Sequence, residues 1–146
     1  MPRYFTKKEA ERLLPHVEQA IRAAIELKKF YVEAEMILQQ EARRVMAAGG
    51  VAANSMQLEP ERSRRDTCAA RLRDAIETIH SYGCEVKDLD IGLIDFRTLY
   101  RGQEVYLCWK LGEEGIRFWH GLTEGFPGRK EIDEEFLANH RGTTVH

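Results

Sequence analysis

The sequence has few cysteines and prolines, the residues that cross-link or rigidify many small proteins. It contains three cysteines, Cys68, Cys84 and Cys108, and four prolines among 146 residues. An odd number of widely spaced cysteines without a C-x-x-C pair argues against a disulfide scaffold or a zinc ribbon. We therefore expect reduced thiols and a cytoplasmic location.

Long apolar runs and an excess of one charge are also missing. No stretch approaches the roughly 18 apolar residues of a membrane span, and the first residues lack the apolar segment of a signal peptide. The 22 basic and 24 acidic residues give a net charge of −2, which provides no general attraction for nucleic acid or anionic lipid. We therefore expect a chain that is neither secreted nor inserted in a membrane and that binds no nucleic acid.

The composition is typical of one globular domain, with 43% hydrophobic and 32% charged residues. We predict an α+β fold: a long antiparallel helical hairpin followed by a small antiparallel three-stranded sheet. In this interpretation residues 1–83 form the hairpin, 84–129 a β-rich half and 130–146 a polar C-terminal tail. The tail contains Phe136, which can dock a short helix.

Two signals bound the first helix. Thr6 and Glu9 form the pattern of a capping box, which predicts that a helix begins there. Pro15 predicts a short first helix and then a kink or restart, because proline lacks the amide donor. Apolar residues then recur three or four apart from Val17 to Val45, which indicates one buried helical stripe.

A second helix should run back beside the first. Gly49 and Gly50 predict a loop, Pro60 lies near the next helix start, and Gly83 marks its end. The first turns of this helix, residues 61–66, offer no apolar face to the far end of the first helix. We therefore predict a homodimer through the helices, which would cover the apolar residues there: Leu38, Ala42, Val45 and Met46.

Beyond Gly83 the apolar pattern alternates, which predicts strands at 84–96, 104–111 and 116–122 with turns at Arg101-Gly102 and 112–115. In the first strand Asp88 and Asp90 would share a face. If the polar faces of the three strands coincide, they gather five side chains on one surface: Asp88, Asp90, Cys108, Lys110 and His120.

Such a surface suggests acid–base or metal chemistry. The catalytic candidates are Asp88, Asp90, Lys110, His120 and Arg129, because paired acids and a nearby cation tune a general base. The candidate metal ligands are Asp88, Asp90, His120 and Cys108, a donor set suited to a divalent Zn, Mn or Fe ion. No H-E-x-x-H or paired-cysteine spacing supports either idea, and a solvated face with cross-strand ion pairs explains the same charges.

Several stretches resemble a bacterial family known as domain of unknown function 2203. They include Tyr4-Phe5-Thr6, the run from Gly83 to Asp90, Gly92 to Phe96, Leu107 to Glu113, and Trp119-His120. The resemblance extends to Arg129 and implies no established activity, cofactor or partner. It draws attention to the polar positions within those stretches: Lys87, Asp88, Asp90, Asp95, Cys108, Lys110, Glu113, His120 and Arg129.

Two functions remain open from the sequence. The favoured one is a dimeric cytoplasmic interaction or structural module, in which Trp109, Phe118 and Trp119 form a partner surface. The alternative is a metal-binding protein or small-molecule enzyme whose site lies on the polar face of the sheet. The first is preferred because no catalytic motif is present.

Overall fold

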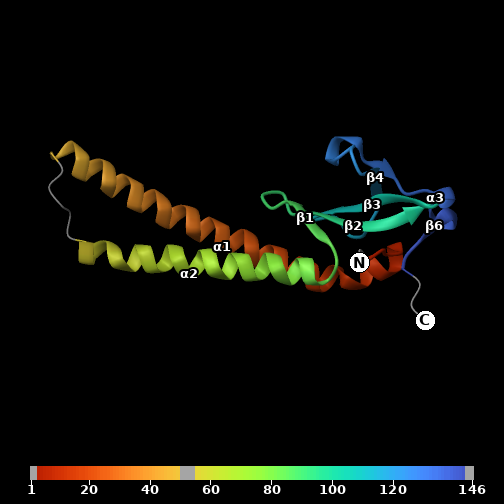
Figure 1. The fold of residues 1–146 in the computed structure, drawn as a ribbon, viewed down its shortest axis with the longest axis horizontal. Coiled ribbons are helices and arrows are strands. Elements are labelled where there is room, and N and C mark those ends of the chain that lie inside the picture. Colours follow the sequence, from red (N-terminus) through yellow and green to blue (C-terminus); the bar gives the residue numbers. More distant parts are fainter. Residues whose placement is uncertain (1–2, 50–54, 144–146) are drawn as a thin grey trace. The chain divides into compact units, whose positions relative to one another are not determined.

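A computed structural model describes residues 3–49 and 55–143, without the side chains of residues 55–57 (Figure 1). Within these residues the helices are α1 (Lys7–Ala47), α2 (Ser55–Ser81), the 3-10 helix η1 (Phe126–Gly128) and α3 (Glu134–Asn139). The strands are β1 (Glu85–Asp88), β2 (Leu93–Tyr100), β3 (Gln103–Lys110), β4 (Phe118–Gly121), β5 (Lys130–Glu131) and β6 (His140–Arg141). The α+β class predicted from the sequence is confirmed.

The capping box at the start of α1 is also confirmed. The amide of Glu9 donates to the Thr6 hydroxyl at 3.2 Å, and the amide of Thr6 donates to the Glu9 carboxylate at 3.0 Å. These bonds satisfy amide groups that have no partner within the helix. They fix the first residue of α1 at Lys7.

The predicted break at Pro15 is wrong. Helix α1 continues through Pro15 for 41 residues. Pro15 is exposed, so its ring lies on the solvent side, whereas its neighbours Leu14 and Val17 are buried. Burial of these flanking side chains outweighs the one backbone hydrogen bond that proline cannot make.

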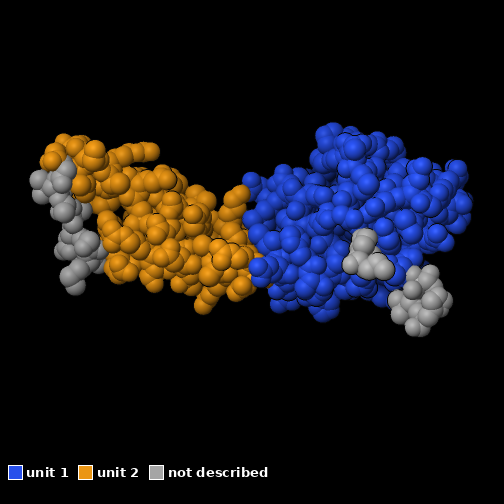
Figure 2. Space-filling model, in the orientation of Figure 1, with its two compact units in different colours: residues 1–22, 76–146 blue, residues 23–75 orange. Residues whose placement is uncertain are grey.

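The chain divides into two compact units, residues 1–22 with 76–146 and residues 23–75 (Figure 2). In the second unit α1 and α2 are joined by ion pairs, Arg64 to Glu33 at 2.7 Å and Arg65 to Glu35 at 3.2 Å. The loop predicted around Gly49 and Gly50 lies partly outside the described residues. None of the described helices combines the length and apolar character needed to cross a bilayer.

The sheet belongs to the first unit and is antiparallel, with the order β1-β2-β3-β4-β5 and β6 beside β2. The prediction of three strands is corrected to six within the described residues. The stretch predicted as one strand, 84–96, is two strands joined by a turn. In that turn the amide of Asp90 donates to the Asp88 carboxylate at 3.0 Å, and Gly92 has a φ of 67°. Aspartate and glycine favour this geometry, so the turn interrupts the alternating pattern.

Gly92 provides a test of this turn. A Cβ at Gly92 would lie 2.6 Å from the Cβ of Leu111, whereas a Cβ at Gly102, also at positive φ, would meet nothing within 4 Å. We expect Gly92→Ala to lower the free energy of unfolding by about 2–4 kcal/mol, the sum of backbone strain and overpacking. Gly102→Ala should cost about 1 kcal/mol, from the backbone alone. Urea denaturation of both variants measures the difference, and equal losses would contradict the close packing at Gly92.

The apolar face of the sheet packs against the start of α1, which lies below the sheet in the view of Figure 1. Phe5, just before α1, meets Phe96 of β2 edge to face with ring centroids 5.3 Å apart. Side chains alternate along a strand, so the residues on either side of Phe96 in β2, including Asp95, point to the opposite face. The apolar core is therefore on one side of the sheet, and the candidate chemistry lies on the other.

The C-terminal segment docks on the far end of the same sheet. Asp133 caps α3 by accepting from the amide of Phe136 at 2.8 Å. The buried Phe136 ring then stacks on Tyr100 and Trp119, with centroids 4.7 and 5.0 Å away. This aromatic packing explains why a mostly polar segment is held against the sheet.

Candidate functional site

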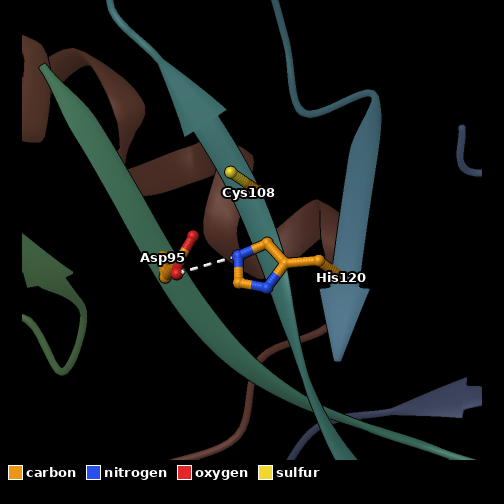
Figure 3. Close-up of side chains that lie close together, drawn as sticks. All are labelled: Asp95, Cys108 and His120. Atoms are coloured by element: carbon orange, nitrogen blue, oxygen red, sulfur yellow. Dashed lines mark hydrogen bonds and ion pairs between the residues drawn. The ribbon is translucent and has the colours of Figure 1, made fainter. Parts of the chain in front are cut away.

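Three polar side chains from neighbouring strands form a buried cluster: Asp95 on β2, Cys108 on β3 and His120 on β4 (Figure 3). Asp95 is directly opposite Cys108, and His120 is opposite Tyr106, two residues from Cys108 on the same strand. Side chains in such positions share one face. Each residue offers a ligand atom within 4.8 Å of the others, and their exposures are 1%, 0% and 2%.

Both ring nitrogens of His120 face oxygen atoms. Nε2 lies 3.0 Å from Oδ2 of Asp95, and Nδ1 lies 2.8 Å from the carbonyl oxygen of Gly121. A carbonyl only accepts, so Nδ1 carries a proton. Burial lowers the pKa of His120, but the bonds to Asp95 and Gly121 outweigh it and raise the pKa above its usual value. The bonds to Asp95 and Gly121 thus favour the protonated form of the ring.

One carboxylate oxygen of Asp95, Oδ1, is not bonded to His120. This Oδ1 is buried and accepts no hydrogen bond of good geometry from the described residues. A buried acceptor without a partner costs about 1–3 kcal/mol, so such an atom calls for an explanation. The buried Nε of Arg129 is also without a partner in that part of the chain, but as a cationic donor it cannot bind a metal. Asp95 Oδ1 is an electron-pair donor directed into the cluster.

Cys108 is a poor nucleophile in this setting. Burial raises the pKa of its thiol, and its interaction with the Asp95 carboxylate, by charge and by hydrogen bonding, raises it further. His120 cannot activate the thiol, because its two nitrogens are already engaged by Asp95 and Gly121. Nucleophilic catalysis by a thiolate needs the opposite, a lowered pKa beside a base. The thiol instead has the position of a metal ligand.

The donor set fits a divalent metal. A thiolate, an imidazole nitrogen and a carboxylate oxygen are the three atom types that zinc binds. The Gly121 carbonyl holds the proton on Nδ1, which leaves Nε2 to the metal; this is the usual orientation of a ligating histidine. A metal at Nε2 would take the place of the proton that Nε2 now shares with Asp95. Three protein ligands leave one position of a tetrahedral site for water or a substrate.

Arg129 and Lys110 lie at the edge of this region. Nη2 of Arg129 is 2.8 and 2.7 Å from the two oxygens of Glu113, and its guanidinium stacks on Phe118 at 4.0 Å. The backbone amide of Lys110 donates to Glu113, and its Nζ lies 5.8 Å from the Phe126 ring. Arg129 is thus held by a carboxylate and an aromatic ring.

Asp88 and Asp90 are not brought into the cluster. Both are exposed, Asp88 at the end of β1 and Asp90 in the turn that follows. The grouping of these acids with Cys108, Lys110 and His120 assumed one continuous strand over 84–96. The turn at Gly92 shows that this assumption is wrong. Asp95, rather than Asp88 or Asp90, is the acid that lies beside Cys108 and His120.

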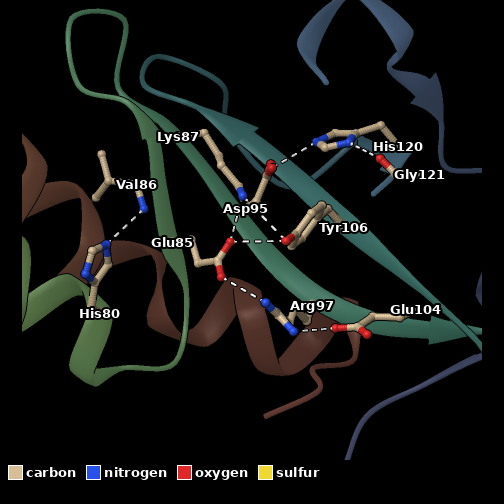
Figure 4. Close-up of polar contacts among 10 residues, drawn as sticks. All are labelled: His80, Glu85, Val86, Lys87, Asp95, Arg97, Glu104, Tyr106, His120 and Gly121. Carbon is tan, nitrogen blue, oxygen red and sulfur yellow. Dashed lines mark hydrogen bonds and ion pairs between the residues drawn. The ribbon is translucent and has the colours of Figure 1, made fainter. Parts of the chain in front are cut away.

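The same face of the sheet carries a half-buried ionic network next to the cluster (Figure 4). Glu85, opposite Asp95 on β1, accepts from Lys87 at 2.8 Å, from Arg97 at 3.2 Å and from the Tyr106 hydroxyl at 3.2 Å. Burial raises the pKa of Glu85, but these contacts outweigh it and lower the pKa below its usual value. Glu85 is therefore ionised, with its charge shared between two cations.

Comparison with known proteins gives one result. A family model described as "Uncharacterized conserved protein (DUF2203)" matches residues 3–132. This chain belongs to the DUF2203 family. The resemblance noted in the sequence is thereby confirmed, and the buried cluster lies within the matched region. No curated protein and no solved structure matches this DUF2203 chain significantly.

Asp95 was missed as a metal ligand although it stood among the polar positions of the DUF2203 motifs. A local signal was present: Asp95 is the one charged residue in Leu93-Ile94-Asp95-Phe96, a run that is buried throughout. A carboxylate inside such a run must have a partner, because burial of an unpaired charge is costly. That signal indicates a site but does not say which distant residues complete it.

Proposed function

We propose that this DUF2203 chain is a metal-binding protein whose centre is the buried cluster of Asp95, Cys108 and His120. One observation carries the proposal: three different donor atoms from three adjacent strands lie within 4.8 Å of one another. The buried Oδ1 of Asp95, which accepts no hydrogen bond of good geometry from the described residues, and the Nδ1–H bond of His120 to Gly121 support it, since both suit a metal.

Zinc is the metal that these donors favour. Mn prefers carboxylate, carbonyl and water oxygens, whereas the thiolate of Cys108 suits softer ions, Zn and Fe among them. Zinc further accepts a mixed set of sulfur, nitrogen and oxygen in a tetrahedral arrangement. A site with three protein ligands has the composition of a catalytic centre rather than a closed structural one. The chemistry supplied would be activation of a water or polarisation of a bound oxygen.

Elemental analysis of the untagged native protein tests the proposal. We expect near-stoichiometric zinc in the wild type and a loss of most of it in Asp95→Asn, which keeps the shape of the side chain but removes its charge. Asp88→Asn is the matched control, because Asp88 is an exposed acid outside the cluster. Equal metal in both variants, or no metal in wild type after incubation with Zn, Mn and Fe, would contradict the proposal.

A second candidate function, a dimeric interaction module, is favoured by the apolar surface of α1. Several large apolar side chains of α1 are exposed in the second unit, namely Phe30, Val32, Met36, Ile37 and Met46. Met46 has the largest exposed fraction among them, 76%. Exposed apolar groups in such number favour a protein contact, and a second copy of the chain is the simplest partner.

Light scattering on the purified protein tests the dimer. We expect twice the mass of 16.9 kDa at micromolar concentration. Met36→Glu together with Ile37→Glu should give a monomer without loss of helix content, because both side chains are exposed. A wild-type monomer across this concentration range would contradict the dimer and leave the metal proposal intact.

We also propose that α1 and α2 form an antiparallel hairpin. Residues 48–54 separate them, and seven residues span at most about 25 Å. A parallel return would need to cover the length of α2, about 40 Å for 27 residues at 1.5 Å each. The connection is therefore too short for a parallel pair. The two interhelical ion pairs support close packing.

A location in the bacterial cytoplasm completes the proposal. Cys68, Cys84 and Cys108 are all free and buried, as expected where thiols stay reduced. A reduced Cys108 is also what a metal centre requires, since the thiolate is the ligand.

A further inference from the structure

An open pocket of about 720 Å³ lies around the start of β1, in the first unit. Its size falls in the range of small-molecule sites, roughly 300–1,000 Å³. The polar residues and the thiol that line it are Arg3, His80, Cys84, Glu85, Lys87 and Arg97. Neither the metal centre nor the apolar surface of α1 uses these side chains.

The negative charge of the pocket is already neutralised. Glu85 accepts from Lys87, Arg97 and the Tyr106 hydroxyl, so both of its oxygens are occupied (Figure 4). Arg97 is shared with Glu104 through Nη1 at 2.6 Å. A carboxylate held by two cations and a hydroxyl is a weak site for any further cation. A cationic ligand is therefore disfavoured.

Arg3 supplies the unbalanced charge. Its Nη1 donates to the Tyr82 carbonyl at 3.3 Å and its guanidinium stacks on Phe5 at 4.4 Å. Arg3 pairs with no carboxylate in the part of the chain that the structure describes. A guanidinium has five N–H donors, and a single carbonyl uses few of them. The remaining donors of Arg3 are at the pocket wall and exposed to solvent.

Among the described residues that line the pocket or pair with its lining, the charges sum to a single positive one. Arg3, Lys87 and Arg97 contribute three positive charges, and Glu85 and the attached Glu104 remove two. The Nε2 atom of His80 accepts from the amide of Val86 at 3.4 Å (Figure 4), so this nitrogen is already engaged within the protein. The pocket is thus matched to one negative charge.

We propose that this pocket binds the carboxylate of a small organic acid, with Arg3 as the principal anchor. A guanidinium presents paired donors that match the two oxygens of a carboxylate. The volume far exceeds that of a carboxylate alone, so the ligand carries an organic body that lies along Val86 and Cys84. The proposal stands on the pocket's own residues and holds whether or not the cluster binds a metal.

Benzoate and benzamide test this proposal as a matched pair, because they have the same shape and differ in charge. Amide NMR spectra of the full-length protein are recorded during titration with each compound. We expect benzoate to produce saturable shifts at Gly83, Val86 and Lys87, and benzamide to produce none. Arg3→Gln should weaken benzoate binding about tenfold, the loss of one charge-assisted contact.

Arg12→Gln is the control, since Arg12 is also exposed and in the first unit but does not line the pocket. It should leave benzoate binding unchanged. Equal responses to benzoate and benzamide, or shifts that do not saturate, would overturn the proposal. Benzoate binding that is unaffected by Arg3→Gln and shifts the amides of Asp95, Cys108 and His120 would also overturn it, because the carboxylate would then be bound by the metal centre.

Discussion

Cys108→Ser is expected to weaken zinc binding by about 100-fold or more. Changes to groups that merely orient a ligand cost 10–100-fold in metal affinity, and this substitution removes a ligand itself. A serine hydroxyl at the same position is a much poorer zinc ligand than a thiolate, because it stays protonated near neutral pH. Competition with a chromogenic zinc chelator measures the affinity of wild type and variant.

Cys84→Ser is the matched control for that substitution. Cys84 is 2% exposed and Cys108 is 0% exposed, so both replacements place a hydroxyl in a buried position. Cys84 donates instead to the carbonyl of Ile79 and lies outside the cluster. Its variant should keep the wild-type zinc affinity. A similar loss in both variants would mean that zinc binds through general thiol chemistry or that both proteins unfold.

Phe96→Ala is expected to lower the free energy of unfolding by about 3–5 kcal/mol. Phe96 is fully buried and packs edge to face on Phe5, so its loss leaves a cavity between the sheet and the segment that leads into α1. A loss of that size is a large part of the total stability of an ordinary domain, about 5–15 kcal/mol. Urea denaturation followed by circular dichroism measures it.

Phe126→Ala provides the comparison for Phe96→Ala. Phe126 is 38% exposed and its ring faces the cations of Arg129 and Lys110. Its removal should cost about 1 kcal/mol, the value of an exposed cation–π contact. Phe96→Ala with a loss as small as this would contradict the packing of Phe5 on the sheet.

The helices could be predicted from the sequence because the patterns that indicate them involve residues close together in the chain. Thr6 and Glu9 are three residues apart, and their capping box fixes the start of α1 as predicted. The helix break predicted at Pro15 was wrong because the prediction used only the local effect of proline. It did not include the burial of Leu14 and Val17, which stabilises the continuous helix. Burial of these side chains is set by the folded chain as a whole, which a rule about neighbouring residues does not include.

The site was only partly accessible for the same reason. Cys108 and His120 were both predicted as ligands, but the acids predicted beside them were Asp88 and Asp90 rather than Asp95. Which acids reach β3 depends on the turn at Gly92 and on a bulge in the pairing of β1 with β2 between Val86 and Asp88. A shift of one residue exchanges the two faces of a strand, so alternation alone could not decide between the acids.

X-ray absorption at the zinc edge of the native protein tests the central claim most directly. The cluster predicts one sulfur at about 2.3 Å together with nitrogen or oxygen ligands at about 2.0–2.2 Å. The sulfur signal should disappear in Cys108→Ser and remain in Cys84→Ser. A zinc environment of nitrogen and oxygen alone in the wild type would contradict the assignment of Asp95, Cys108 and His120 as one metal centre.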